Sequence, residues 1–379
     1  MQVILLLEQK CRLSCFLKKK DFFVKTFFYH LFLQHFIYFR SLKFCMRKIA
    51  MICCILFMLG KVSAQDPHFS QFFSSPLTLS PAFTGKFDGN YRIAGNYRNQ
   101  WATINNAFTT GTASIDFRIM KNHIPSNDAW GLGFMAYNDK SAAGAVNFNY
   151  ATISTAYHKG LDEEGYHQLS AGFQVTYANM FINTTDLKFE DQLTTVGFTG
   201  VTNEIFSNTT LKSNYVDVNA GILYNGSTTD RNNFYFGVSL YHITRPQQHF
   251  TGGTFDLNSR ATIHAGTYFP IGEISTLHLS ALQSFQGGAS ETVLGGAFQF
   301  TANNGSDMPA SLYVGSWMRF NDAIIPYVGL EYNNLRLGIT YDANTSSLKT
   351  ASQGQGGFEF SLIYIYKPST DKPLNCPKF

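Results

Sequence analysis

LSAGFQVTY, residues 169–177, alternates apolar side chains with small or polar side chains at every second position. Leucine, alanine, phenylalanine, valine and tyrosine occupy the odd positions, and serine, glycine, glutamine and threonine occupy the even ones. Successive side chains of an extended strand point to opposite faces of a sheet. The stretch therefore predicts a β-strand with one apolar face and one polar face.

The same alternation recurs from about residue 87 to residue 367. Further clear examples are Tyr91–Arg98, Thr112–Ile119, Val216–Tyr224, Asn334–Asp342 and Phe358–Tyr366. Clusters of Asn, Gly, Asp, Ser and Pro separate about 14 such segments. The sequence after residue 64 shows no helical period sustained over four turns, so an all-β fold is predicted.

Two architectures can accommodate strands of this kind. A soluble sandwich or propeller would bury the apolar faces, whereas an outer-membrane barrel would turn them to lipid and keep the polar faces in its lumen. The segments are about 10 to 13 residues long, which suits tilted membrane-spanning strands better than the shorter strands of sandwiches. Closure also removes exposed sheet edges. We therefore predict a transmembrane antiparallel up-and-down β-barrel of about 14 strands over residues 87–367, with a sandwich or propeller as the alternative.

Aromatic residues recur near the ends of the segments, as the interfacial girdles of a membrane barrel require. They are Tyr97, Trp101, Trp130, Tyr157, Tyr177, Tyr224, Tyr241, Trp317, Tyr341 and Tyr366.

The first 64 residues differ in composition from the rest. Residues 46–64 read as a secretory signal peptide, with a basic pair, an apolar run and Val62-Ser63-Ala64 before the expected cleavage site. Residues 1–45 are then a start-site artefact or a non-native extension, because a signal peptide should begin the chain. A genuine extension or anchor is the alternative. Export would place the protein outside the cytoplasm.

Removal of this part changes the charge and the thiol count. The first 64 residues contain 11 of the 29 basic and 2 of the 25 acidic residues, so 18 basic and 23 acidic residues remain, a net charge of −5. Five of the six cysteines also lie there, which leaves only Cys376 and excludes an internal disulfide or a cysteine-based metal site.

Composition excludes several classes of protein. Aromatic residues make up 16% of the chain and charged residues only 14%, which argues against a disordered protein and against a strongly charged nucleic-acid binder. A mean hydropathy of −0.09 leaves no room for many apolar spanning helices.

Sequence motifs give little support for catalysis. Gly131–Ala136 matches a phosphate-binding pattern but continues a strand pattern, and Ser346–Lys349 lacks the partner motifs of its enzyme class. His278 and Ser280 allow a lipid-boundary hydrolase as a remote alternative, and His158, His242 and His264 read as lumenal or girdle residues. We predict no enzymatic activity, no cofactor, no metal site and no nucleic-acid partner.

The beginning of the predicted mature chain carries a distinctive motif. Residues 65–73 read QDPHFSQFF and residues 76–85 read PLTLSPAFTG, which together resemble the opening motif of the PorP/SprF family of Bacteroidetes. Four later stretches are also similar to family motifs: Tyr97–Trp101, Asp139–Gly144, Gly338–Asp342 and Cys376–Phe379. Ser80 stands where the family usually has Asn, and Phe358-Glu359 replaces the common His-Glu.

The resemblance implies an outer-membrane protein of the type IX secretion system in a Gram-negative bacterium. Members of the family are thought to assist the export or surface attachment of large adhesins, including gliding adhesins. The implied partners are secreted adhesin cargo, a periplasmic ring lipoprotein and a peptidoglycan-binding protein, besides the outer-membrane lipid bilayer. The alternative is a diffusion channel or a small-molecule uptake porin.

Four regions outside the strands are singled out. Residues 65–86 are predicted to be a periplasmic segment or a plug of the barrel, whereas residues 368–379 form a C-terminal tail. Residues 182–212 and 245–259 are predicted to be long extracellular loops. Candidate partner-contact or plug residues are Asp66, Pro67, Phe69, Gln71, Pro76, Pro81 and Phe83, and the residues of the later family motifs are Tyr97, Arg98, Gln100, Trp101, Tyr341 and Asp342.

Overall fold

The computed structural model describes residues 66–104, 108–206, 208–229, 232–250, 253–302 and 309–367. The predicted extension, signal peptide and C-terminal tail, residues 1–45, 46–64 and 368–379, lie outside the described residues.

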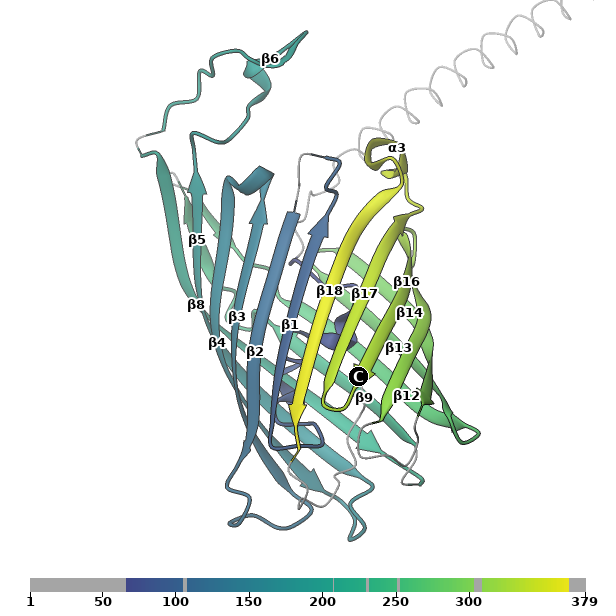
Figure 1. Ribbon diagram of the computed structural model, residues 1–379. Helices are drawn as coiled ribbons and strands as arrows, with labels where there is room; N and C mark the ends of the chain where they lie inside the picture. Colours follow the sequence, from purple (N-terminus) through teal and green to yellow (C-terminus); the bar gives the residue numbers. More distant parts are fainter. Residues whose placement is uncertain are drawn as a thin grey trace, which may run out of the picture. The chain divides into compact units, whose positions relative to one another are not determined.

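Within these ranges, fourteen antiparallel strands follow one another around a closed barrel, and β1 pairs with β18 to complete it (Figure 1). The predicted up-and-down barrel is therefore confirmed. The strands are β1 (Tyr91–Gln100), β2 (Phe108–Ile119), β3 (Ala129–Ser141), β4 (Val146–Gly160), β5 (Gln168–Asn183), β8 (Thr210–Gly226), β9 (Asn233–Tyr241), β12 (Arg260–Ile271), β13 (Ser275–Gln286), β14 (Ala289–Ala302), β15 (Ala310–Arg319), β16 (Ala323–Tyr332), β17 (Leu335–Asn344) and β18 (Gln355–Tyr366).

The apolar faces of the strands point outward. In β5, Phe173 and Val175 are 60% and 50% exposed, whereas the intervening Gln174 is 2% exposed. This inverts the pattern of a soluble sandwich, because the polar residues are the buried ones. It is the arrangement of a membrane barrel, whose outer surface faces lipid.

Two of the aromatic residues assigned to the girdles lie on the other face. Tyr241 and Trp317 are buried in the lumen, where Trp317 stacks on Phe73 and Tyr241 donates a hydrogen bond to the carbonyl of Leu77. The girdle interpretation is wrong for these two, since an aromatic residue near a strand end can serve either face.

The two ends of the barrel differ. β1 begins beside the end of β18, where Tyr91 pairs with Tyr366, and we call this the turn end. The opposite end, called the loop end, carries the two longest connections, residues 184–209 and 242–259. These correspond to the loops predicted at residues 182–212 and 245–259. The first loop is shorter than predicted, because β5 and β8 extend into it, and the second is longer, because β9 ends at residue 241.

Short helices and hairpins lie within both long loops and within some of the other loops. Two hairpins, β6 (Leu193–Thr194) with β7 (Gly197–Phe198) and β10 (Gln247–Phe250) with β11 (Gly253–Asp256), belong to the long loops. The other short elements are η3 (Ala142–Gly144), η4 (Glu190–Gln192) and α3 (Lys349–Ser352). Among the described residues, no helix is both long enough and apolar enough to cross a bilayer.

Residues 66–87 lie inside the barrel, and we call them the lumenal segment. The segment contains three short helices, η1 (Phe72–Ser74), α2 (Pro76–Leu79) and η2 (Pro81–Phe83), which are visible in purple within the barrel (Figure 1). Prolines begin α2 and η2, where a missing N–H costs no hydrogen bond. The hydrophobic core forms between this segment and the wall, with Phe73 and Phe83 at its centre.

Candidate functional site in the barrel lumen

The lumenal segment runs through the barrel from the loop end to the turn end. Its first residue, Asp66, bonds to Gln286 at the loop end of β13. Near its other end, the carbonyl of Thr84 lies 2.8 Å from His158 Nε2 in the turn-end half of β4. The wall and the segment therefore contact each other along the length of the lumen.

Asp66 is held by a group that we call the loop-end anchor: Asp66, Asp217, His242, Arg260 and Gln286. The Asp66 carboxylate lies 2.7 Å from His242 Nε2 and 3.4 Å from Arg260 Nη1, and it accepts a 2.9 Å hydrogen bond from Gln286. The other ring nitrogen of His242 lies 2.9 Å from Asp217. One imidazole thus joins a carboxylate of the segment to a carboxylate of the wall.

His242 follows the last residue of β9 and lies outside the spanning strands. Burial opposes its protonation, but hydrogen bonds and charges from Asp217 and Asp66 outweigh burial and raise its pKa to about 9. The same contacts, led by the Arg260 charge, overcome the burial of Asp66 and hold the pKa of its carboxyl below its usual range. The anchor therefore contains charged partners at neutral pH.

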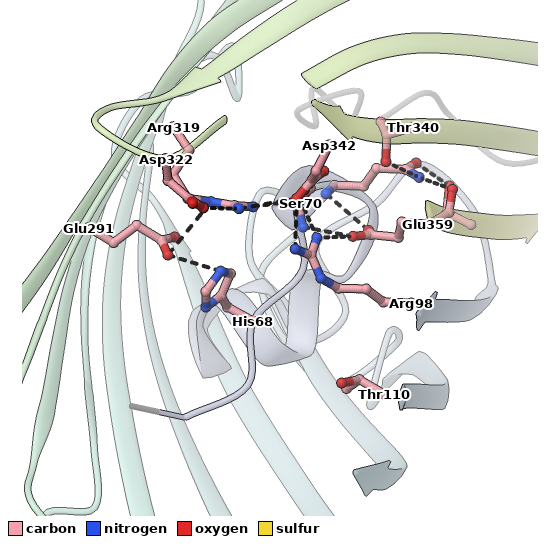
Figure 2. A network of polar contacts seen from close by, with 12 residues as sticks. His68, Ser70, Arg98, Thr110, Glu291, Arg319, Asp322, Thr340, Asp342 and Glu359 are labelled. Atoms are coloured by element: carbon pink, nitrogen blue, oxygen red, sulfur yellow. Dashed lines mark hydrogen bonds and ion pairs between the residues drawn. The ribbon is translucent and has the colours of Figure 1, made fainter. Parts of the chain in front are cut away.

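A second cluster, the central network, joins the segment to the first and last strands of the barrel (Figure 2). Arg98 of β1 donates to Asp342 of β17 at 2.7 Å and to Glu359 of β18 at 3.1 Å. Arg98 also donates to the Ser70 hydroxyl, which in turn donates to Asp342 at 2.8 Å. Ser70 thereby connects the segment to both charges of the Arg98–Asp342 pair.

The backbone of the segment is bound by one carboxylate. The N–H groups of Ser70 and Gln71 donate to the two oxygens of Glu359 at 2.7 and 3.0 Å. The Gln71 amide accepts a 2.6 Å hydrogen bond from Ser361 and donates to Thr340 at 3.3 Å. These contacts fix the register of the segment against β17 and β18.

Arg319 of β15, which is separated from β17 only by β16, extends the network along the wall (Figure 2). It donates to Ser70 at 2.6 Å, to Asp322 at 2.8 Å and to Asp342 at 3.1 Å. Glu291 lies 3.7 Å from Arg319 and 2.9 Å from His68 of the segment. Two buried arginines are thus surrounded by carboxylates from the wall and by donors and acceptors of the segment.

This arrangement makes the network sensitive to the loss of one member. Arg98, Asp342 and Glu359 are at most 2% exposed, so each charge depends on its partners for the stabilisation that water would otherwise provide. Removing one partner of such a buried group costs about 3–5 kcal/mol, because a buried charge is left uncompensated.

A third cluster, the turn-end anchor, holds the end of the segment. Arg92 donates to Asp116 at 2.8 Å and to the carbonyl of Phe83 at 3.1 Å. Asp116 also accepts a 2.7 Å hydrogen bond from the N–H of Gly85. Both members of this wall ion pair therefore bind the backbone of the segment.

Aromatic contacts connect the three polar clusters. Phe73 stacks on Trp317 with ring centroids 4.5 Å apart and meets Tyr327 edge-on. Phe83 packs edge-on against Tyr235 at 5.7 Å. Aromatic pairs of this kind stabilise beyond their buried area.

Glycines in the wall leave space for the backbone of the segment. A Cβ on Gly172 of β5 would lie 2.4 Å from the carbonyl carbon of Pro81, and a Cβ on Gly131 of β3 would lie 2.1 Å from the carbonyl oxygen of Thr84. Gly131 belongs to the apparent phosphate-binding motif, which here is strand glycine against the segment. No larger residue fits at either position without displacing backbone.

The predicted residues fall into two groups. The structure brings together Asp66, Gln71, Arg98 and Asp342 in the loop-end anchor and the central network. The remaining residues singled out in the segment are partly or fully buried in the lumen: Pro67, Phe69, Pro76, Pro81 and Phe83.

Four family-motif residues lie away from this network. Tyr97 and Tyr341 are on the outer face, 47% and 41% exposed, because they alternate with Arg98 and Asp342. Gln100 ends β1 at the loop end, and Trp101 follows it with its ring 5.5 Å from that of Phe108.

Sequence reasoning missed Glu359, Arg319 and His242. The sequence singles out Glu359 only as part of a departure from the family pattern, and His242 only as one histidine among several. The sequence does contain a signal for such residues: a charged residue on the inner face of a strand whose other inner residues are Ser, Thr and Gly. Such residues need partners, and the only partners across a lumen are remote in sequence.

His278 and Ser280 line the same small cavity inside the barrel. His278 contacts Gln299 at 2.9 Å, and Ser280 accepts a 2.9 Å hydrogen bond from Trp317. In the described part of the chain, no three His, Cys, Asp or Glu side chains group closely enough to hold a metal ion.

Comparison with solved structures finds barrels of low sequence identity. A deletion mutant of the monoaromatic hydrocarbon channel TodX has a TM-score of 0.44 at 8% identity, covering 76% of this chain and 92% of that one. The channel CymD gives 0.43 at 9% identity over 78% and 93%. A Pseudomonas aeruginosa FadL homologue gives 0.40 at 11% identity over 76% and 92%. A search of curated proteins finds no match.

The sequence itself gives the family. The family described as "Type IX secretion system membrane protein PorP/SprF" matches residues 61–364, which include the lumenal segment and all but the end of the barrel. The motifs on which the resemblance rests, in residues 65–73, 97–101 and 338–342, supply Ser70, Arg98 and Asp342 to one buried network. The chain belongs to the PorP/SprF family of type IX secretion system membrane proteins.

Proposed function

We propose that the protein is a non-enzymatic outer-membrane barrel that assists the export or surface attachment of large adhesins by binding cargo or components of the secretion machine. In this proposal the barrel anchors the protein in the membrane, and the loops between its strands are the surfaces that bind partners. The observation that carries it is the occupation of the lumen by the protein's own N-terminal segment.

Buried ion pairs hold that segment at three levels of the lumen. Asp66 is bound at the loop end, Ser70 and Gln71 in the central network, and Gly85 at the turn end. A channel needs a continuous water-filled path, whereas these contacts hold a segment of the chain inside the lumen. This favours a docking role over the alternative of a diffusion channel or uptake porin.

The loop 184–209 offers a surface for a partner. Val196, Val201 and Ile205 are 81%, 90% and 94% exposed, although they lie beyond the strands that face lipid. Exposed apolar side chains on a loop beyond the membrane are a feature of interaction sites. Longer loops of outer-membrane barrels lie outside the cell, so secreted cargo is the partner we assign to this loop.

The other proposed partners would meet the opposite end. A periplasmic ring lipoprotein or a peptidoglycan-binding protein would contact the turn end, where the barrel begins and ends at Tyr91 and Tyr366. The two ends thus allow cargo and machine to be held at the same time.

Replacing residues 193–205 by a Gly-Ser linker of equal length tests the assignment. We expect the barrel to insert and fold normally while surface-retained adhesin, measured on intact cells, falls several-fold. A matched control replaces residues 247–256, the other hairpin of the loop end. Unchanged adhesin retention in the 193–205 variant would refute the loop as the cargo surface.

A further inference from the structure

A cavity of about 130 Å³ lies between the lumenal segment and the wall near the loop end. Strands β3, β4, β5, β8, β9, β12, β13 and β14 of the wall contribute to its lining, together with the lumenal segment, including residues 66–69. An engineered apolar cavity of about 150 Å³ binds one benzene molecule. The cavity therefore has the size of a single six-membered ring.

Tyrosines make up much of the lining. Tyr137, Tyr150, Tyr215 and Tyr241 all border the cavity, and the rings of Tyr137 and Tyr150 lie 5.2 Å apart. The hydroxyls of Tyr137 and Tyr241 donate to carbonyls of the lumenal segment, at Pro67 and Leu77. Those hydroxyls are therefore engaged, which leaves ring surface as their contribution to a ligand.

Several polar groups of the lining lack a hydrogen-bond partner among the described residues, and Gln174 carries one of them. Gln174 of β5 is 2% exposed, and among the described residues nothing donates a hydrogen bond to its Oε1 atom. A buried acceptor without a donor is destabilising, so a ligand with a hydroxyl group gains by supplying one. A purely apolar ring would leave the acceptor unsatisfied.

The charges around the cavity are already paired with one another. Asp66 and Asp217 flank His242, Arg260 approaches Asp66, and Glu291 lies 2.9 Å from His68. An ionic ligand would have to break these pairs at considerable cost. The lining thus disfavours ions as well as hydrocarbons.

We propose that the lumen carries a small-molecule site for an uncharged, hydroxyl-bearing six-membered ring, bound between the tyrosine rings with its hydroxyl donated to Gln174. The side chain of His68, which lines the cavity, is 31% exposed. Both a pyranose sugar and a phenol have the required chemistry. The site is separate from the proposed cargo surface, because no residue of the loop 184–209 lines the cavity.

Isothermal titration of the purified full-length barrel in detergent tests this proposal with two probes, methyl β-glucopyranoside and phenol. We expect saturable binding of one of them at millimolar concentration, and the probe that binds identifies the source. Gln174→Leu should weaken that binding about tenfold, since one hydrogen bond to a buried acceptor is lost.

Asn96→Leu is the matched control. Asn96 is another buried lumenal amide whose side-chain atoms have no partner among the described residues, and it does not border the cavity. Binding should survive this change. The proposal is overturned if neither probe binds, or if Gln174→Leu and Asn96→Leu affect binding equally while both barrels remain folded by heat-modifiable gel mobility.

Discussion

Arg98 shows how much a single residue can determine in this barrel. It reaches Asp342, Glu359 and Ser70, so one side chain ties together β1, β17, β18 and the lumenal segment. The motif that contains Arg98 could be recognised in the sequence. Its partners could not be, because Asp342 and Glu359 are 244 and 261 positions away and alternation alone does not say which inner-face charges meet.

Arg98→Met should destabilise the barrel by about 3–5 kcal/mol, because Asp342 and Glu359 would remain buried with less compensation. Thermal unfolding in detergent, followed by heat-modifiable gel mobility, measures the effect. The double variant Arg98→Met/Asp342→Asn should lose less stability than the sum of the two single variants. Additive losses would mean that the pair is not coupled.

His242 predicts a pH dependence at the loop end. Its pKa is raised from an ordinary value near 6.5 to about 9 by Asp217 and Asp66, so its contribution to stability is complete below about pH 6.5. That contribution is lost as the pH rises through about 9. The melting temperature of the wild type should therefore fall over this window, and His242→Gln should lack this part of the decrease. Parallel profiles for the two proteins would contradict the assignment.

At the scale of elements, alternation predicted the strands and their outward faces well. Period 2 fixes which residues share a face, and a chain with apolar residues on one face of every long strand must bury that face in lipid or in a second sheet. Loop boundaries were less accurate, since β8 begins with the polar run Thr210–Asn214 that reads as loop. The path of the lumenal segment could not be predicted, because it depends on contacts with strands from both ends of the chain.

Gly172 provides a test of the fit between the segment and the wall. Gly172→Ala would place a Cβ 2.4 Å from Pro81 and about as close to the backbone of Ala82, so the segment must move away from β5. We expect faster proteolysis within residues 66–87 of the folded barrel. Gly111→Ala on β2, where the nearest atom is 3.9 Å away, is the matched control and should leave the proteolysis rate unchanged.

At the scale of the whole molecule, the lumenal segment bears on whether the barrel is a docking protein or a pore. The wild type reconstituted in planar bilayers should show no stable conductance, because residues 66–87 are bound inside the lumen in three polar clusters. A variant lacking residues 66–82 should either open a stable pore or fail to assemble. Stable, solute-selective pores in the wild type would favour the uptake porin instead.

The central network also has a consequence for the order of folding. Ser70 lies near the start of the barrel sequence, and its partner Glu359 lies 289 positions later on the strand that closes the barrel. Contacts this distant in sequence form slowly, because the chain must close a very large loop before they stabilise anything. The polar groups of the lumenal segment must therefore stay hydrated until the final strand, β18, has formed. Pairing of β18 with β1 and binding of the lumenal segment in the lumen therefore become one late, cooperative step.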